Sequence, residues 1–144
     1  KFLVKEHLKE ELENQEFYSI SQGYLVNEKS KSVRVRIRND KAFLTIKSGM
    51  TGISRNEYEY AIPESDARSL IESLNIRVLT KKRYHLTVFS KLWEIDVFEG
   101  KLEGLVIAEI ELKSEDEEFE FPGWLGKEVT HDPAYLNANL INRL

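Results

Sequence analysis

The chain has 144 residues, a formal net charge of −4 and no cysteine, and 41% of its residues are hydrophobic. This length and composition predict one globular domain over residues 1–144, without disulfides, thiolate metal sites or a cysteine nucleophile. The net negative charge argues against a nucleic-acid partner. No apolar run approaches the roughly 20 residues that cross a bilayer, and no signal-like segment opens the chain. We therefore expect no membrane partner and a cytoplasmic protein, as a monomer or homodimer.

Eight segments alternate polar and apolar residues, as strands with one covered face do. Turn-forming residues between them, such as Asn39-Asp40 and the Gly49 to Gly52 loop, imply short connections and antiparallel hairpins. These features predict a mainly β (α+β) fold, an eight-stranded antiparallel β-barrel or a strongly curved sheet. The predicted strands are roughly residues 2–4, 17–26, 31–38, 42–48, 56–62, 77–89, 92–98 and 105–113.

Three segments carry apolar residues at helical spacing, and we predict helices over residues 6–13, 63–74 and 130–144. Ser65 or Asp66 is the expected N-cap of the second helix, and Asp132, followed by Pro133, that of the third. Amphipathic helices need an apolar surface to cover. If the charged faces of the strands point inward, the outer wall is apolar and these helices pack on it. An open sheet with a helical layer would satisfy the same pattern.

The charges on the strands come in blocks of one sign. A strand places residues i and i+2 on the same face roughly 7 Å apart, so Arg34, Arg36 and Arg38 form a cationic row. Lys81 and Arg83 form a second one, while Glu57/Glu59 and Glu109/Glu111 form anionic rows. Such rows repel unless something binds between them. A phosphate chain would satisfy the cations, and divalent metal ions would satisfy the carboxylates, which predicts phosphoryl-transfer chemistry.

Other candidate features are interpreted as structural. His7, His85 and His131 are scattered without ligand spacing, although His85 falls on the same strand face as Arg83. The acidic run 114–121 is expected to be a solvated loop after the last strand. Trp93 and Trp124 are expected to be packing residues.

The charged segments are similar to those of the CYTH superfamily, the triphosphate tunnel metalloenzymes, and most of all to the small bacterial inorganic triphosphatases. The resemblance runs along the whole chain. It rests on the order and spacing of KFLV, QGYL, VRVR, LTIKS, SRNEYEY, KKRY, EIDVF, AEIEL and EVTHDPAYLN. It implies an eight-stranded tunnel that hydrolyses a linear triphosphate with Mg²⁺ or Mn²⁺.

The resemblance also assigns roles to residues. Lys81 is the implied catalytic residue, contacting the reacting phosphate or water as a base or as an electrostatic clamp. The implied phosphate-binding residues are Lys1, Arg34, Arg36, Lys47, Lys81 and Arg83. The implied metal-binding residues are Glu57, Glu59, Asp96, Glu109 and Glu111. The C-terminal helix is expected to plug or border one opening.

The family signature is Glu-x-Glu-x-Lys, and the sequence given begins at its lysine, Lys1. A molecule that lacked both glutamates is expected to bind metal poorly and turn over slowly. Adenylyl cyclase and thiamine or nucleoside triphosphatase activities are the alternatives within the same fold. From other classes, the alternatives are a polyphosphate-binding module without activity and a purely structural β-domain.

Overall fold

The computed structural model describes residues 1–5, 8–49 and 55–144, and the predicted residues His7 and Gly52 lie outside them. The described strands form one antiparallel sheet in the order β5-β4-β3-β2-β6-β7-β8-β1-β9. Eight of the nine strands were predicted, with ends within a few residues. The strands are β1 (Phe2–Val4), β2 (Phe17–Asn27), β3 (Lys31–Arg38), β4 (Lys41–Ser48), β5 (Asn56–Ile62), β6 (Leu79–Val88), β7 (Lys91–Phe98), β8 (Val106–Ile110) and β9 (Leu125–Glu128).

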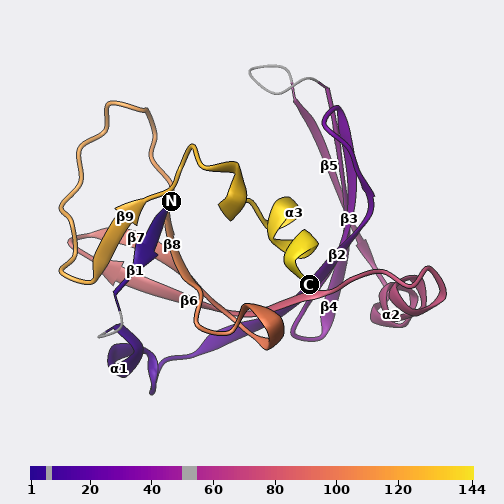
Figure 1. Cartoon of the computed structure of the whole chain (residues 1–144), viewed down its shortest axis with the longest axis horizontal. Coiled ribbons are helices and arrows are strands. Elements are labelled where there is room, and N and C mark those ends of the chain that lie inside the picture. The colour runs from indigo at the N-terminus through magenta and orange to yellow at the C-terminus, as the bar shows by residue number, and fades with distance from the viewer. Residues whose placement is uncertain (6–7, 50–54) are drawn as a thin grey trace.

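The sheet is strongly curved but open, with β5 and β9 as its two edges. The predicted mainly antiparallel β fold with a strongly curved sheet is confirmed, although the word barrel overstates how far the sheet closes. Figure 1 shows β2 to β5 as one wall and β1, β7, β8 and β9 as the other, with the C-terminal segment between them. This segment occupies the space across which the two edges would have to meet.

Strand β9 was not predicted. Its four residues, LGKE, contain a glycine and two charged residues, so they lack the alternation that marks a strand. β9 pairs with β1, and Gly126 lets the two backbones approach closely. A Cβ atom at position 126 would lie 2.8 Å from the carbonyl oxygen of Leu3. The strand thus depends on its partner rather than on its own composition.

Two helices, α1 (Leu8–Leu12) and α2 (Glu64–Ser73), lie outside the curve of the sheet (Figure 1). Leu8 and Leu12 pack in one outer core with Trp93. Ala67 of α2 packs in a second outer core that includes Val35 and Ile37 of β3. These contacts confirm that apolar strand faces point outward beneath amphipathic helices.

The predicted caps of α2 are wrong. The helix begins at Glu64, directly after Pro63, and no side chain caps its first turn. Pro63 precedes the helix with φ −58° and ψ 139°, and its carbonyl oxygen accepts hydrogen bonds from the N–H groups of Asp66 and Ala67 at 3.0 and 3.1 Å.

The C-terminal segment is not one helix, and it does not pack outside. It consists of a 3₁₀ helix (Pro133–Tyr135), α3 (Asn137–Leu140) and a second 3₁₀ helix (Ile141–Arg143). Leu136 is extended (ψ 136°) and separates the first two. The predicted cap is confirmed, because the Asp132 side chain accepts a hydrogen bond of 3.0 Å from the Ala134 N–H. Leu140 and Ile141 pack on the inner face of the sheet, against a core that includes Phe98 and Ile107.

The remaining expectations concern the tryptophans and the acidic run. Trp93 and Trp124 are buried against each other, as predicted. The acidic run forms a loop, but it is not the last connection because β9 follows it. It is also only partly solvated, since Phe119 packs on Phe2 and Trp93. No helix within the described ranges has the length and apolar character needed to span a membrane.

Candidate active site

The charged residues of the central strands gather on the inner, concave face of the sheet. The register pairs Arg36 with Gln22, Tyr18 with Arg83, and Arg83 with Asp96, so these side chains share one face. The alternate residues of the same strands, such as Val35 and Ile95, belong to the outer cores. The prediction that the charges point inward is therefore confirmed.

Three residues form a buried ion cluster at the centre of this face, and we call Lys81, Arg83 and Asp96 the central cluster. The Lys81 Nζ atom lies 2.6 Å from Asp96 Oδ2, and both side chains are almost completely buried. Arg83 donates from Nε and Nη2 to the two Asp96 oxygens, at 2.7 and 2.8 Å. Asp96 is thus surrounded by cations and unavailable to a metal ion in this arrangement.

The pKa values in the central cluster follow from burial and ion pairing. Burial, only partly offset by Asp96, lowers the pKa of Lys81 to about 8. Burial alone would raise the pKa of Asp96, but hydrogen bonds from Arg83 and the charge of Lys81 lower it below its ordinary value. Burial would lower the pKa of Arg83, and the bonds to Asp96 more than reverse this. The cluster therefore carries two positive charges and one negative charge at neutral pH.

Arg34 and Arg36, on β3, have neutral partners instead. Arg36 Nε donates to Gln22 Oε1 at 2.9 Å, and Arg34 Nη2 donates to Thr45 Oγ1 at 3.3 Å. Burial first, and then the charges of Arg34 and Arg83, lower the pKa of Arg36 to about 10. The arginine row and the central cluster are therefore close enough for the charges of one to shift the pKa values of the other.

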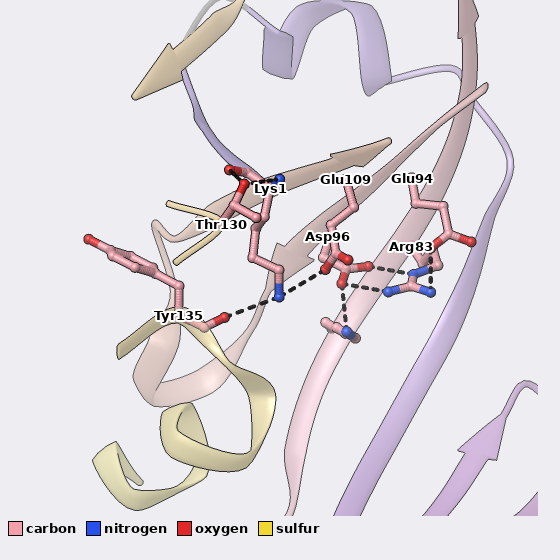
Figure 2. Close-up of polar contacts among 8 residues, drawn as sticks. Lys1, Arg83, Glu94, Asp96, Glu109, Thr130 and Tyr135 are labelled. Carbon is pink, nitrogen blue, oxygen red and sulfur yellow. Dashed lines mark hydrogen bonds and ion pairs between the residues drawn. The ribbon is translucent and has the colours of Figure 1, made fainter. Parts of the chain in front are cut away.

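Arg83 also contacts Glu94, a residue that the sequence analysis did not select. Arg83 Nη1 lies 2.8 Å from Glu94 Oε2, and His85 Nε2 lies 3.4 Å from the other oxygen, Oε1. Figure 2 shows the Arg83 guanidinium between the carboxylates of Asp96 and Glu94. Glu94 precedes Asp96 by two residues, so the period-two pattern already placed it on this face.

Lys1 and Glu109 form a pair beside the central cluster (Figure 2). Lys1 Nζ lies 3.2 Å from Glu109 Oε1 and donates to the Tyr135 carbonyl oxygen at 3.3 Å. Glu111 follows the end of β8 and is exposed. Both glutamates line a cleft of about 610 Å³, together with Glu94, Lys91 and Lys113. We call it the acidic cleft.

The remaining predicted site residues lie at the opposite end of the sheet. Lys47 Nζ is 3.9 Å from Glu57 Oε2, and Thr45 donates to Glu59 at 3.1 Å. Both glutamates are on the edge strand β5, whereas Glu109 and Glu111 belong to the opposite wall. Lys47 and Arg34 line a second cleft, of about 540 Å³, between β2 to β4 and the C-terminal segment. We call it the basic cleft.

The structure does not bring the five predicted metal-binding carboxylates together. Within residues 1–5, 8–49 and 55–144, no three His, Asp or Glu side chains are placed to hold a metal ion. Glu109 and Glu111 nevertheless offer oxygen ligands in one cleft. Mg²⁺ is commonly held by one or two carboxylates, with water and substrate phosphates completing its shell. The acidic cleft therefore fits a metal ion that is shared with a phosphate ligand.

Comparison with known proteins identifies the family of this chain. The CYTH domain matches residues 1–144. The chain belongs to the CYTH family. An inorganic triphosphatase of Acetivibrio thermocellus is 53% identical over 121 residues, which cover 83% of this chain and 78% of the relative. An inorganic triphosphatase of Nitrosomonas europaea is 38% identical over 125 residues, covering 84% and 82% of the two chains.

Solved structures share the fold. The crystal structure of the inorganic triphosphatase NE1496 aligns with a TM-score of 0.73 and 33% identity, over 97% of this chain and 93% of that one. The PH1012 protein from Pyrococcus horikoshii OT3 aligns with a TM-score of 0.51 and 19% identity, over 78% of each chain, which supports the fold alone.

Two further inner-face residues were not selected from the sequence, Gln22 and Thr45. Both are buried, and each holds one arginine of the cationic row. Gln22 lies in the QGYL segment, in the middle of β2. The sequence did offer a signal for Gln22, because it is a polar residue opposite an arginine across a predicted hairpin, and buried polar groups need hydrogen-bond partners.

Proposed function

We propose that this CYTH protein hydrolyses inorganic triphosphate to pyrophosphate and phosphate on the concave face of its sheet, with the help of a divalent metal ion. Two relatives that share most of their length with this chain are inorganic triphosphatases. We also propose Mg²⁺ or Mn²⁺ as the cofactor and a location in the cytoplasm. The alternative activities are not favoured by any feature of the described residues.

The observation that carries the proposal is that Arg34 and Arg36 lie on the inner face and form no ion pair with any residue in the described part of the chain. The charges of Arg34 and Arg83 also contribute to lowering the pKa of Arg36. A protein without an anionic ligand gains nothing from holding half-buried arginines against each other. A linear triphosphate supplies the missing negative charge along its length.

The residues would divide the work of phosphoryl transfer. Arg34 and Arg36 would bind phosphate oxygens and neutralise their charge, because guanidinium groups suit phosphate geometry. Lys81 would act as an electrostatic clamp on the reacting phosphate, since a pKa of about 8 leaves it mainly charged at neutral pH. Positioning and charge stabilisation of this kind supply most of the catalysis of phosphoryl transfer.

Glu109 and Glu111 would hold the metal ion in the acidic cleft. When bound, the ion would stabilise negative charge on the phosphate oxygens and lower the pKa of a water ligand. Glu57 and Glu59, which the family resemblance implied as further ligands, lie on the other wall. We propose that they instead keep Lys47 and the Thr45–Arg34 contact in place.

The test is phosphate release from tripolyphosphate, ATP and pyrophosphate, each with Mg²⁺, with Mn²⁺ and with a chelator. Metal-dependent release that strongly favours tripolyphosphate is expected. Equal or faster turnover of ATP would favour a nucleotide enzyme. Thermal stabilisation by tripolyphosphate without release would indicate a binding protein, and the absence of both effects would overturn the proposal.

A further inference from the structure

Arg83 is held by two carboxylates that differ greatly in their exposure to solvent. Asp96 is buried and is also bound to Lys81, so it is fixed. Glu94 contacts Arg83 through a single oxygen, and 39% of its side chain is exposed at the acidic cleft. A guanidinium has five N–H donors. Three of them are engaged here, two with Asp96 and one with Glu94.

A phosphate that approaches Arg83 from the acidic cleft meets Glu94, which lines that cleft. Its oxygens would compete for the Nη1 group that Glu94 holds, and the two negative charges would repel. Glu94 also lies directly across from Glu109 on the neighbouring strand, and like charges in this arrangement destabilise each other. Arg83 therefore binds a phosphate best if Glu94 turns away from it.

A second partner for Glu94 is already in place. His85 is the register partner of Glu94 on β6, and its Nε2 atom lies 3.4 Å from Glu94 Oε1. The imidazole packs against the Tyr18 ring at 5.4 Å between centroids, which fixes its orientation. His85 is 40% exposed, so it can take a proton from solvent. A protonated imidazole would replace the charge that Glu94 loses at Arg83.

We propose that Glu94 is a positioning residue that holds Arg83 in the free protein and transfers to a protonated His85 when a substrate phosphate takes its place. The proposal rests on the proposed function, because it requires a phosphate ligand on the inner face. Triphosphate binding is then coupled to the uptake of one proton from solvent at His85, and no covalent bond changes.

The groups around His85 are few in the described part of the chain. Glu94 faces it from β7, Tyr18 faces it from β2, and Glu16 immediately precedes β2. Arg83 lies two residues away on the same strand. The Arg38 guanidinium lies over the Tyr18 ring at 5.4 Å. Among these groups, only Glu94 combines contact with His85 and contact with the proposed phosphate site.

The test is an NMR titration of the histidine side chains with and without tripolyphosphate, in the presence of a chelator to prevent turnover. The chain has three histidines, so a His85→Gln variant assigns the resonance and His131 serves as an internal control. Tripolyphosphate is expected to raise the titration midpoint of His85, because Glu94, which now divides its contacts between Arg83 and His85, would pair with the imidazole alone. In Glu94→Gln most of this shift should be lost.

The outcomes separate this proposal from the function on which it rests. Tripolyphosphate binding without a shift at His85, or a full shift in Glu94→Gln, would overturn the exchange and leave the triphosphatase proposal intact. No binding by the wild type would overturn both. As a second measurement, His85→Gln should weaken tripolyphosphate binding several-fold at pH 6 and leave it nearly unchanged at pH 9. Equal weakening at both values would contradict proton-linked exchange.

Discussion

The two halves of the concave face manage positive charge differently. On β6 to β8 each cation has a carboxylate partner, as Lys81 and Arg83 have Asp96. On β3, Arg34 and Arg36 have neutral partners, and neither forms an ion pair with any residue that the structure describes. In the first half the cations are neutralised by carboxylates of the protein, whereas in the second half the arginine charges are available to a ligand. Substitutions in the first half should therefore affect stability as well as binding and turnover, whereas those in the second half should affect mainly binding.

The largest effect on stability is expected from Asp96→Asn. The change leaves Lys81 and Arg83 buried without their counter-charge, which typically costs about 3–5 kcal/mol when one partner of a buried pair is lost. Urea unfolding measures it. The double variant Lys81→Met/Asp96→Leu should lose less stability than Asp96→Asn, since it also removes one of the two stranded charges, that of Lys81. Similar losses in both variants would show that the pair does not set the cost.

The largest effect on binding is expected from Arg36→Gln. Loss of a charged hydrogen-bond donor to phosphate should weaken tripolyphosphate binding by about 2 kcal/mol, or roughly thirty-fold. The free energy of unfolding should change by less than about 1 kcal/mol, because relief of arginine repulsion offsets the lost contact with Gln22. Arg68→Gln on the outer helix α2 is the matched control and should bind normally. Calorimetric titration and urea unfolding together decide between a binding and a structural role for Arg36.

Much of this division was predictable from the sequence. The period-two pattern identified eight of the nine strands, the charged faces and the row formed by Lys81 and Arg83, and the family resemblance added Asp96. The pattern could not show that Asp96 is taken by cations, because Lys81 and Asp96 meet only through the β6–β7 register. The pattern also could not distinguish Glu57 from Glu109. Both glutamates alternate with apolar residues along the chain, but they lie on opposite walls of the sheet. The break at Leu136 and the strand β9 depend on packing partners rather than on local composition.

The pH dependence of turnover sharpens the role of Lys81. Its pKa is lowered to about 8, so the side chain is charged below that pH and loses its charge above it. If Lys81 clamps phosphate as a cation, kcat/KM for tripolyphosphate should fall as the pH rises through about 8. In Lys81→Arg the fall should move to higher pH, because arginine keeps its proton. A rise of kcat/KM through pH 8 would instead identify Lys81 as a general base.

The two acidic pairs should differ in their effect on metal dependence. Glu109→Gln is expected to raise the Mg²⁺ concentration for half-maximal activity by about ten-fold, as the loss of one ligand at a two-carboxylate site would. Glu57→Gln is the control on the opposite wall, and it should change that concentration less than two-fold. Equal effects would mean that the metal ion bridges the two walls.

The smallest effect is expected at the edge of the sheet. Lys47 and Glu57 form a partly exposed pair at 3.9 Å, and pairs of this kind contribute about 0–1 kcal/mol. Glu57→Gln should therefore change the free energy of unfolding by less than about 0.5 kcal/mol in urea unfolding. A loss of stability comparable to that of Asp96→Asn would contradict the proposed difference between the two halves of the concave face.

The most direct test of the account is a crystal structure of the protein with tripolyphosphate bound in the absence of divalent metal. We predict phosphate oxygens within hydrogen-bond distance of Arg34, Arg36 and Lys81 on the concave face. Phosphate bound only elsewhere, with Arg34 still on Thr45 and Arg36 still on Gln22, would contradict the claim that this half of the sheet keeps its charge for the substrate.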